Sequence, residues 1–245
     1  MHEDDLSLSL EDLARLLTGE TSLKSTLTRV ATLAVQAIPG AEGAGLTLLE
    51  QDRPQTVIAT DDFVREVDDV QYGLGEGPCI SAVSARRTFT SGNLGGEPMW
   101  PRFGPRVGRL GVHSALSLPL LVNDQAIGAL NVYARPHGSF DAEAVRLGEA
   151  FASPAAVSVA NARALAQAER LVEQLTDALR SRAGIDQALG VVMSLTGCTP
   201  DEAFTQLREQ SQARQVKLVD VARELVADAV AEAKVRRAVP PQSRS

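Results

Sequence analysis

Aromatic residues and basic charge are both scarce in this 245-residue chain. Phe, Trp and Tyr together make up 4% of the residues, which is too few for the aromatic platforms on which several single-strand binders stack bases. The net charge is −7, whereas proteins held to nucleic acid by bulk electrostatics usually carry a basic domain. By composition alone, nucleic acid is therefore an unfavoured partner.

Cysteine and histidine are also rare. The two cysteines, Cys79 and Cys198, exclude a disulfide framework and a four-cysteine zinc module. The three histidines lack metal-ligand spacing, so no metal site is expected. This usage is typical of a reducing cytosol. The acidic first residues lack the order of a signal peptide, and no run is long and apolar enough to span a bilayer, which predicts a cytoplasmic protein with no membrane partner.

The signatures of common enzymes are missing as well. There is no G-x-S-x-G, H-E-x-x-H, P-loop or kinase motif, so no catalytic residue is expected. The composition is instead that of a globular protein, with 44% hydrophobic and 22% charged residues. The length suits two domains.

Changes in composition and in hydrophobic pattern along the chain predict five segments. They are a helical extension (1–19), an α+β domain (20–165), a linking helix (166–182), a helical block (183–237) and a disordered tail (238–245).

The α+β domain is predicted to be an antiparallel sheet flanked by helices. Strands are expected over 44–49, 55–60, 88–91, 114–121 and 126–133, and helices over 22–38, 62–70 and 79–85. Residues 92–105 form a Gly/Pro-rich loop. A last helix runs from about 141 to 181, and Pro154 must kink or locally break it.

A heptad seam follows. Leu165, Ala168, Val172, Leu175 and Leu179 step by three and four residues, which is the pattern of a coiled coil. We expect this helix to pair with a second copy in a homodimer, with Leu165, Val172, Leu175 and Leu179 in the seam. The alternative is a helix packed on its own domain. Two heptads are short for a stable coiled coil.

The block after the seam is predicted to be all helical. Ile185 begins one helix that ends at Gly197. Thr199-Pro200-Asp201-Glu202 has the chemistry of a capping box and begins the next helix. A third helix begins at Leu218.

The charges of this block are nearly balanced. Over 165–237 there are 10 Lys and Arg against 11 Asp and Glu, so the acidity of the chain belongs to residues 1–164. Arginine forks and amides near a helix junction suit phosphate and base-edge contacts, although a solvated charged face has the same composition. The candidate nucleic-acid ligands are Arg182, Gln187, Arg208, Ser211, Arg214, Gln215 and Lys217.

A second candidate site lies in the α+β domain. The stretch 72–79, Y-G-L-G-E-G-P-C, does not fit G-x-G-x-x-G, and its glycines are expected to permit positive φ or close backbone approach. Cys79 follows Pro78 near a predicted helix start, where the dipole lowers a thiol pKa. A buried, small apolar role is the favoured interpretation of this cysteine, and a redox sensor is the alternative. The candidate ligand-binding residues are Tyr72, Cys79, Trp100 and His113, and no cofactor can be named.

The helical block resembles an ANTAR domain. The likeness rests on R-S-R-A-G-I-D-Q-A-L-G-V-V-M (180–193), C-T-P-D-E-A-F-T-Q-L-R-E-Q-S (198–211) and V-K-L-V-D-V-A (216–222). It implies a three-helix bundle extended from a coiled coil, which binds paired RNA stem-loops in nascent transcripts and lets RNA polymerase read through. Leu189 stands where many members have Lys, and Gln215 where many have Asn.

Residues 20–165 resemble a GAF domain, through G-E-G-P-C (75–79), Met99-Trp100-Pro101 and the strand pair over 114–133. This implies a sensor for a small-molecule ligand. The combined prediction is an RNA-binding antitermination regulator under GAF control. The alternatives are a DNA-binding regulator, a protein-interaction module and a GAF-based enzyme such as a small-molecule sulfoxide reductase, which would need a resolving cysteine near Cys79.

Overall fold

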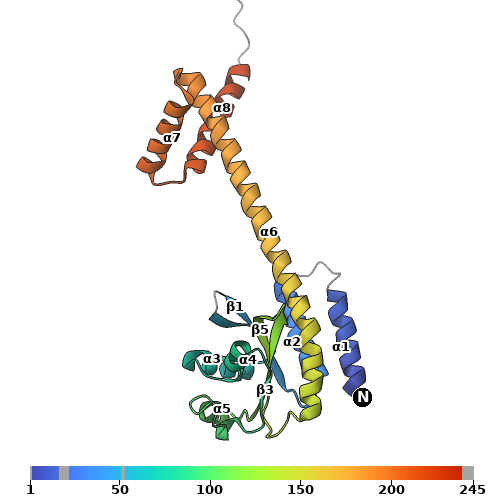
Figure 1. Cartoon of the computed structure of the whole chain (residues 1–245). Helices are drawn as coiled ribbons and strands as arrows, with labels where there is room; N and C mark the ends of the chain where they lie inside the picture. Colours follow the sequence, from blue (N-terminus) through green and yellow to red (C-terminus); the bar gives the residue numbers. More distant parts are fainter. Residues whose placement is uncertain (1, 17–21, 51–52, 239–245) are drawn as a thin grey trace, which may run out of the picture. The chain divides into compact units, whose positions relative to one another are not determined.

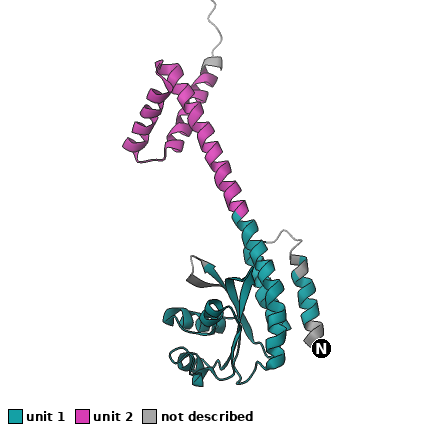
Figure 2. Ribbon diagram, in the orientation of Figure 1, with its two compact units in different colours: residues 1–167 teal, residues 168–245 magenta. Residues whose placement is uncertain are grey.

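A computed structural model describes residues 2–16, 22–50 and 53–238 (Figure 1). The predicted tail beyond residue 238, the predicted helix end at Gly19 and part of the turn over 51–54 lie outside these residues. The chain divides into two compact units, residues 1–167 and 168–245 (Figure 2). None of the described helices is long and apolar enough to cross a membrane.

The first unit is built on one antiparallel sheet of order β2-β1-β5-β4-β3. Its strands are β1 (Gly43–Glu50), β2 (Arg53–Ala59), β3 (Phe89–Ser91), β4 (Ser114–Val122) and β5 (Gln125–Ala134). The prediction of an α+β domain with an antiparallel sheet is confirmed. The β4–β5 turn is tight because Asn123 and Asp124 both adopt positive φ, 49° and 60°, as a hairpin turn that follows the strand twist requires.

One face of the sheet is covered by α2 (Leu23–Ala37) and the first part of α6 (Ala142–Thr196), and α1 (His2–Leu16) packs against α2 (Figure 1). The Ser22 side chain caps α2 by accepting a hydrogen bond from the Ser25 N–H at 3.2 Å. The apolar faces of the three helices and of the strands form one buried core.

The other face carries α3 (Asp62–Leu74), α4 (Pro78–Ala85), a short 3₁₀ turn (Leu94–Gly96) and α5 (Gly104–Arg109). This second apolar cluster contains Trp100, which lies at 6.2 Å from Phe89 and 6.4 Å from Phe103 between ring centroids. Part of the predicted loop 92–105 is therefore helical. A Cβ at Gly104 would overlap the Leu94 carbonyl, so glycine is what lets α5 pack against the 3₁₀ turn.

Helix α6 is longer than predicted. It is continuous through Pro154, so the helix is not broken there, although proline removes one backbone donor. It also continues past residue 181 to Thr196, so the linking helix and the first helix of the second unit are one element. Residues 142–167 belong to the first unit and 168–196 to the second.

In the described part of the second unit, residues 168–238, every element is a helix. The unit consists of 168–196 of α6, α7 (Pro200–Arg214) and α8 (Leu218–Ala238). The predicted capping box is present: Thr199 Oγ1 accepts the Glu202 N–H, and the Glu202 carboxylate accepts the Thr199 N–H at 2.9 Å. The buried core of this unit is small and comprises Ala188, Val192, Ala203, Leu207, Val221 and Ala222.

Candidate functional site

A buried polar network lies between the sheet and α3. Its centre is Asp68, whose side chain is fully buried. One oxygen, Oδ1, accepts hydrogen bonds from Tyr133 OH at 2.6 Å, Gln71 Nε2 at 2.9 Å and Asn131 Nδ2 at 3.3 Å. Burial, followed by the charge of Asp68, raises the pKa of Tyr133 well above its ordinary value, so this phenol stays protonated and donates.

The network extends across the sheet to Tyr72. Asn131 Nδ2 donates to Thr47 Oγ1 at 3.1 Å, and Thr47 Oγ1 shares a hydrogen bond with Tyr72 OH at 2.5 Å. Ser117 Oγ donates to Asn131 Oδ1 at 2.9 Å. Since polar side chains at this depth cost free energy unless they are paired, these partners are what make the cluster tolerable beneath α3.

The glycines of the 72–79 stretch lie where the chain leaves α3 and begins α4, next to this network. Gly75 and Gly77 have φ of 64° and 155°, as the sequence predicts. A Cβ at Gly77 would overlap the Gln71 side chain, whose Oε1 accepts the Cys79 N–H at 3.1 Å. Between the glycines, Glu76 accepts the Phe103 N–H at 3.0 Å, and this bond lowers the pKa of its carboxyl.

The four predicted ligand-binding residues are only partly brought together. Tyr72 OH lies 3.9 Å from Cys79 Sγ, and Trp100 Nε1 donates to Ser81 Oγ on the same helix α4 at 3.0 Å. His113 instead stacks on His137 with ring centroids 4.0 Å apart, and its buried Nδ1 has no partner among the described residues. A ligand role for these four residues stays a prediction.

The structure contradicts the less favoured interpretation of Cys79 as a reactive thiol with a lowered pKa. The residue does follow the first position of α4, but it is fully buried. Burial, with the nearby Asp68 carboxylate as the next cause, raises the pKa of Cys79 to about 11. The dipole of a helix of eight residues does not offset the loss of water. The geometry fits the favoured interpretation, a buried and unreactive cysteine.

At neutral pH we expect iodoacetamide to alkylate Cys198, which is partly exposed, and to spare Cys79 in the folded protein. Because its folded pKa of about 11 exceeds the ordinary value of 9.0, Cys79 contributes stability below pH 9 that is lost as the pH rises toward 11. Peptide mass spectrometry before and after denaturation measures both sites. Equal alkylation rates at the two cysteines in the folded state would contradict the assignment.

In the second unit, five of the predicted nucleic-acid ligands lie around the α7–α8 connection. We call this set the α7–α8 corner; it comprises Arg208, Ser211, Arg214, Gln215 and Lys217. Ser211 Oγ donates to the Val216 carbonyl at 2.6 Å, and Gln215 ends α7 in the left-handed conformation with φ of 53°. These two features fix the path of the backbone between the helices.

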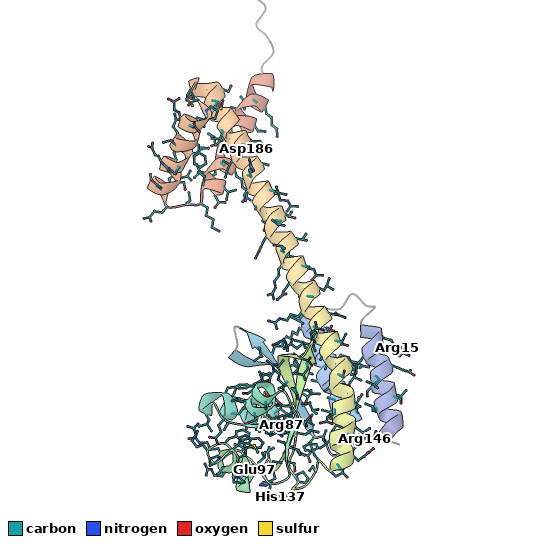
Figure 3. All side chains as sticks on the ribbon, viewed as in Figure 1. Arg15, Arg87, Glu97, His137, Arg146 and Asp186 are labelled. Carbon is teal, nitrogen blue, oxygen red and sulfur yellow. The ribbon has the colours of Figure 1, made fainter. Side chains whose placement is uncertain are left out.

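The cations of the corner differ in their partners. Arg214 donates to the Glu224 carboxylate on α8 at 2.6 Å, while Arg208 and Lys217 are exposed and pair with no acid among the described residues. Arg182, on α6, lies 4.0 Å from Asp186, which is labelled in Figure 3. Exposed pairs of this kind are weak, so all four cations remain available to an anionic partner.

Gln187 lies in different surroundings. It lines a groove of about 790 Å³ between α6 and α8, together with apolar residues such as Leu195 and Val230. The charged residues of this groove are Asp228 and Glu232, both acidic. Carboxylates repel phosphates, so the groove is a poor surface for a nucleic-acid backbone.

The predicted seam is exposed on α6. Leu165 in the first unit is 50% exposed, and Val172, Leu175 and Leu179 in the second unit are 62%, 55% and 68% exposed. Leu171 adds a further exposed apolar side chain beside them. A run of large apolar side chains in water is unusual for a monomer and typical of a surface that binds a partner.

Comparisons with known proteins match this architecture. The GAF domain model matches residues 20–160, more than half of the chain. The chain belongs to the GAF domain family. The ANTAR domain model matches residues 173–226, so this member carries an ANTAR domain, from a family of RNA-binding antitermination regulators, after its GAF domain. No curated protein matches the sequence.

Solved structures show the same fold for the GAF domain. The GAF domain of a phosphoenolpyruvate-protein phosphotransferase from Coxiella burnetii is 17% identical, with a TM-score of 0.52, over 65% of this chain and 95% of that one. A Burkholderia vietnamiensis chain described as a GAF sensor is also 17% identical, with a TM-score of 0.50, over 68% and 99%. A free methionine-R-sulfoxide reductase from Neisseria meningitidis is 16% identical, with a TM-score of 0.49, over 65% and 91%, too weak a likeness to bear on activity.

Proposed function

We propose that this protein is a cytoplasmic transcription antitermination regulator. In this proposal its ANTAR domain binds paired stem-loops in nascent transcripts, close to RNA polymerase, and its GAF domain controls that binding in response to a small-molecule signal. The ANTAR and GAF domains support the RNA and sensor roles at the level of families. The α7–α8 corner, with its exposed cations on a fixed turn, is the observation that carries the proposal.

The corner has the chemistry of a small phosphate-binding surface. Arg208, Arg214 and Lys217 supply cations, and the guanidinium fork matches phosphate geometry. Gln215 supplies an amide for base edges, as the sequence predicts. The Ser211 hydroxyl donates a hydrogen bond to the Val216 carbonyl. We therefore propose that Ser211 stabilises the turn between α7 and α8 in addition to making a polar contact with RNA.

The low net charge of the ANTAR domain favours RNA binding by two copies of the chain acting together. Residues 165–237 carry a net charge of −1, so one ANTAR domain gains little from general attraction to RNA. Pairing of two chains through the exposed seam would present two corners to two stem-loops, and the second contact would then form at high effective concentration. We therefore propose a homodimer as the RNA-binding form, with the GAF signal acting on seam pairing.

The test is a competition experiment at stated salt. Full-length protein is titrated into a labelled RNA with two hairpins, and unlabelled hairpin RNA or duplex DNA is added. We expect hairpin RNA to compete and duplex DNA to fail, and Arg208→Ala to weaken binding about tenfold. Arg223→Ala removes the same charge from an exposed position of α8 outside the predicted ligands; it is the matched control and should bind much as the parent does. Equal competition by duplex DNA would replace the RNA proposal with a DNA-binding regulator.

Breaking the ion pair between Arg214 and Glu224 should raise the affinity for RNA, which is the opposite of the effect expected for Arg208→Ala. Glu224→Gln frees Arg214 from its 2.6 Å partner and removes a carboxylate that repels phosphate, so we expect RNA to bind roughly two to five times more tightly. Fluorescence anisotropy with the same RNA measures the change. Asp228→Gln removes the same charge from the α6–α8 groove and should have a smaller effect; an equal gain from both would mean that only net charge matters.

A further inference from the structure

An aromatic side chain is exposed on helix α7 of the ANTAR domain. Phe204 lies in the second turn of this helix and is 41% exposed. It is also the only aromatic residue in the sequence after Phe151. Its helix neighbours Ala203 and Leu207 are fully buried in the core of the second unit. The helix therefore buries smaller apolar side chains and leaves its largest one partly in water.

The Phe204 ring has no stacking partner in the described part of the chain. All described contacts between two rings, or between an arginine and a ring, lie in the GAF domain. Single exposed apolar side chains are common on proteins, so the surroundings of Phe204 decide whether it has a binding role.

Helix α7 places the ring in one row with the α7–α8 corner. The helix is continuous from Pro200 to Arg214, and residues four and seven apart on a helix lie on one face. Phe204, Arg208 and Ser211 have this spacing. The row is about 10 Å long at the rise of an α-helix. Arg208, one turn from the ring, is exposed and pairs with no acid among the described residues.

The charges on α7 give this row a direction. Asp201, one turn before Phe204, is exposed. The Glu202 carboxylate accepts the Thr199 N–H, and this bond lowers the pKa of Glu202, so it is ionised at neutral pH. These two acids repel phosphate from the start of α7, whereas Arg208 attracts it. A nucleic-acid strand on this row would place its backbone toward the corner and a base toward the ring.

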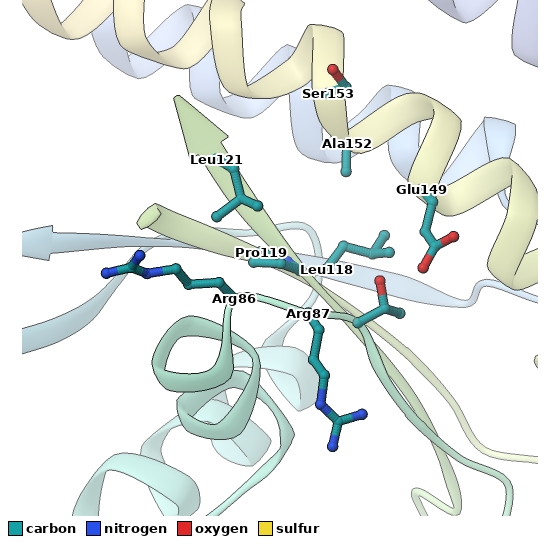
Figure 4. A pocket seen from close by; sticks show the side chains of 9 residues that line it. Arg86, Arg87, Leu118, Pro119, Leu121, Glu149, Ala152 and Ser153 are labelled. Carbon is teal, nitrogen blue, oxygen red and sulfur yellow. The ribbon is translucent and has the colours of Figure 1, made fainter. Parts of the chain in front are cut away.

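The cavity at the edge of the GAF sheet has a different geometry. It has a volume of about 330 Å³ and lies between the start of β3, the second half of β4 and α6. Figure 4 shows the Arg86 and Arg87 side chains pointing to different sides of it, and the Arg87 guanidinium lies over the Phe89 ring at 4.1 Å. The two cations therefore do not meet at one anion there, whereas the spacing on α7 keeps the ring and Arg208 on one face.

A single exposed ring suits an unpaired base better than a base pair. The bases of a stem are stacked on one another, whereas the bases of a hairpin loop can turn outward and stack on an aromatic side chain. Every base has a flat face, so such a stack tolerates different base identities. One ring is less than the multi-aromatic platform that the composition excludes, and it serves one base for each ANTAR domain.

We propose that Phe204 stacks on one unpaired loop base of an RNA hairpin while Arg208 binds a nearby phosphate. This inference rests on the proposed RNA-binding function. It adds the residue through which the ANTAR domain distinguishes a hairpin loop from a continuous stem.

The test combines a protein variant with changes in the RNA. Full-length protein is titrated into the two-hairpin RNA, in which each loop position in turn carries an abasic nucleotide. We expect Phe204→Leu, which keeps an apolar side chain, to weaken binding of the unmodified RNA about tenfold. At one loop position the abasic change should weaken binding by the parent protein to a similar degree and cause no further loss in Phe204→Leu. Phe204→Tyr keeps the ring and should bind within about twofold of the parent.

A fluorescent base gives a second measurement of the same stack. With 2-aminopurine at the sensitive loop position, fluorescence should fall when the parent protein binds and should stay high when Phe204→Leu binds. Leu195→Ala is the control, because it removes an exposed apolar side chain of α6, 69% exposed, and it should bind as the parent does. Phe204→Leu should keep the mass of the parent by sedimentation velocity and its melting temperature by circular dichroism.

Three results would overturn the stacking role while leaving RNA binding in place. They are unchanged affinity of Phe204→Leu, an equal loss for this variant on every abasic RNA, and a change of its mass, which would assign the ring to a contact between proteins. A folded parent protein that binds no hairpin RNA would overturn the proposed function together with this inference.

Discussion

Leu175→Asp lowers the affinity for a two-hairpin RNA by about tenfold or more while leaving the GAF domain folded. Leu175 is 55% exposed in the predicted seam, so the substitution should cost little within one chain. In a dimer it would bury a charge between two helices, which is strongly unfavourable. The loss of pairing removes the second RNA contact and with it the gain in effective concentration. Fluorescence anisotropy and sedimentation velocity measure affinity and mass together.

The control for this variant is Gln174→Asp. It adds the same charge at a neighbouring exposed position of α6 outside the heptad pattern, so both mass and RNA affinity should match the parent protein. A monomeric Leu175→Asp variant with unchanged RNA affinity would show that one ANTAR domain is enough.

Asp68→Ala lowers the free energy of unfolding of the GAF domain by about 3 kcal/mol. The carboxylate oxygen accepts three hydrogen bonds from buried donors, and its removal leaves Gln71, Asn131 and Tyr133 without that acceptor. Each unpaired buried donor costs on the order of 1–3 kcal/mol, offset in part because a buried charge is removed as well. Urea denaturation followed by Trp fluorescence reports on this domain alone, since Trp100 is the single tryptophan.

Asp69→Ala is the matched control. It removes the same charged group from the next residue of α3, which is exposed, and should change the free energy of unfolding by no more than about 0.5 kcal/mol. Equal midpoints for the two variants would contradict the structural role of the Asp68 network.

The elements of the fold follow from local patterns wherever local chemistry decides them. Alternating apolar residues predict β4 and β5, and the polar residues between them predict the turn at Asn123 and Asp124. The α5 helix could not be predicted in this way. Gly104 is a poor helix former, although Pro105 in the first turn is compatible with a helix start. Glycine is needed at 104 because a Cβ there would overlap the Leu94 carbonyl, ten residues earlier.

Long-range contacts also decide properties of the candidate sites that the sequence does not predict. Cys79 follows a helix start, which predicts a lower pKa, but depth in the fold decides the pKa. The sequence signals Arg214 as a phosphate ligand, yet nothing local predicts its pairing with Glu224 on the next helix. Gln187 follows Asp186 directly in the sequence, but its position in one groove with Asp228 and Glu232 of α8 depends on the fold.

The most direct test of bivalent RNA recognition compares two RNAs in one titration series. The first carries two hairpins, and the second carries the same sequence with one stem disrupted. If two ANTAR domains act together, the two-hairpin RNA binds full-length protein at least about tenfold more tightly, with two chains for each RNA by sedimentation velocity. Equal affinity for both RNAs, with one chain bound to each, would contradict the proposed mechanism.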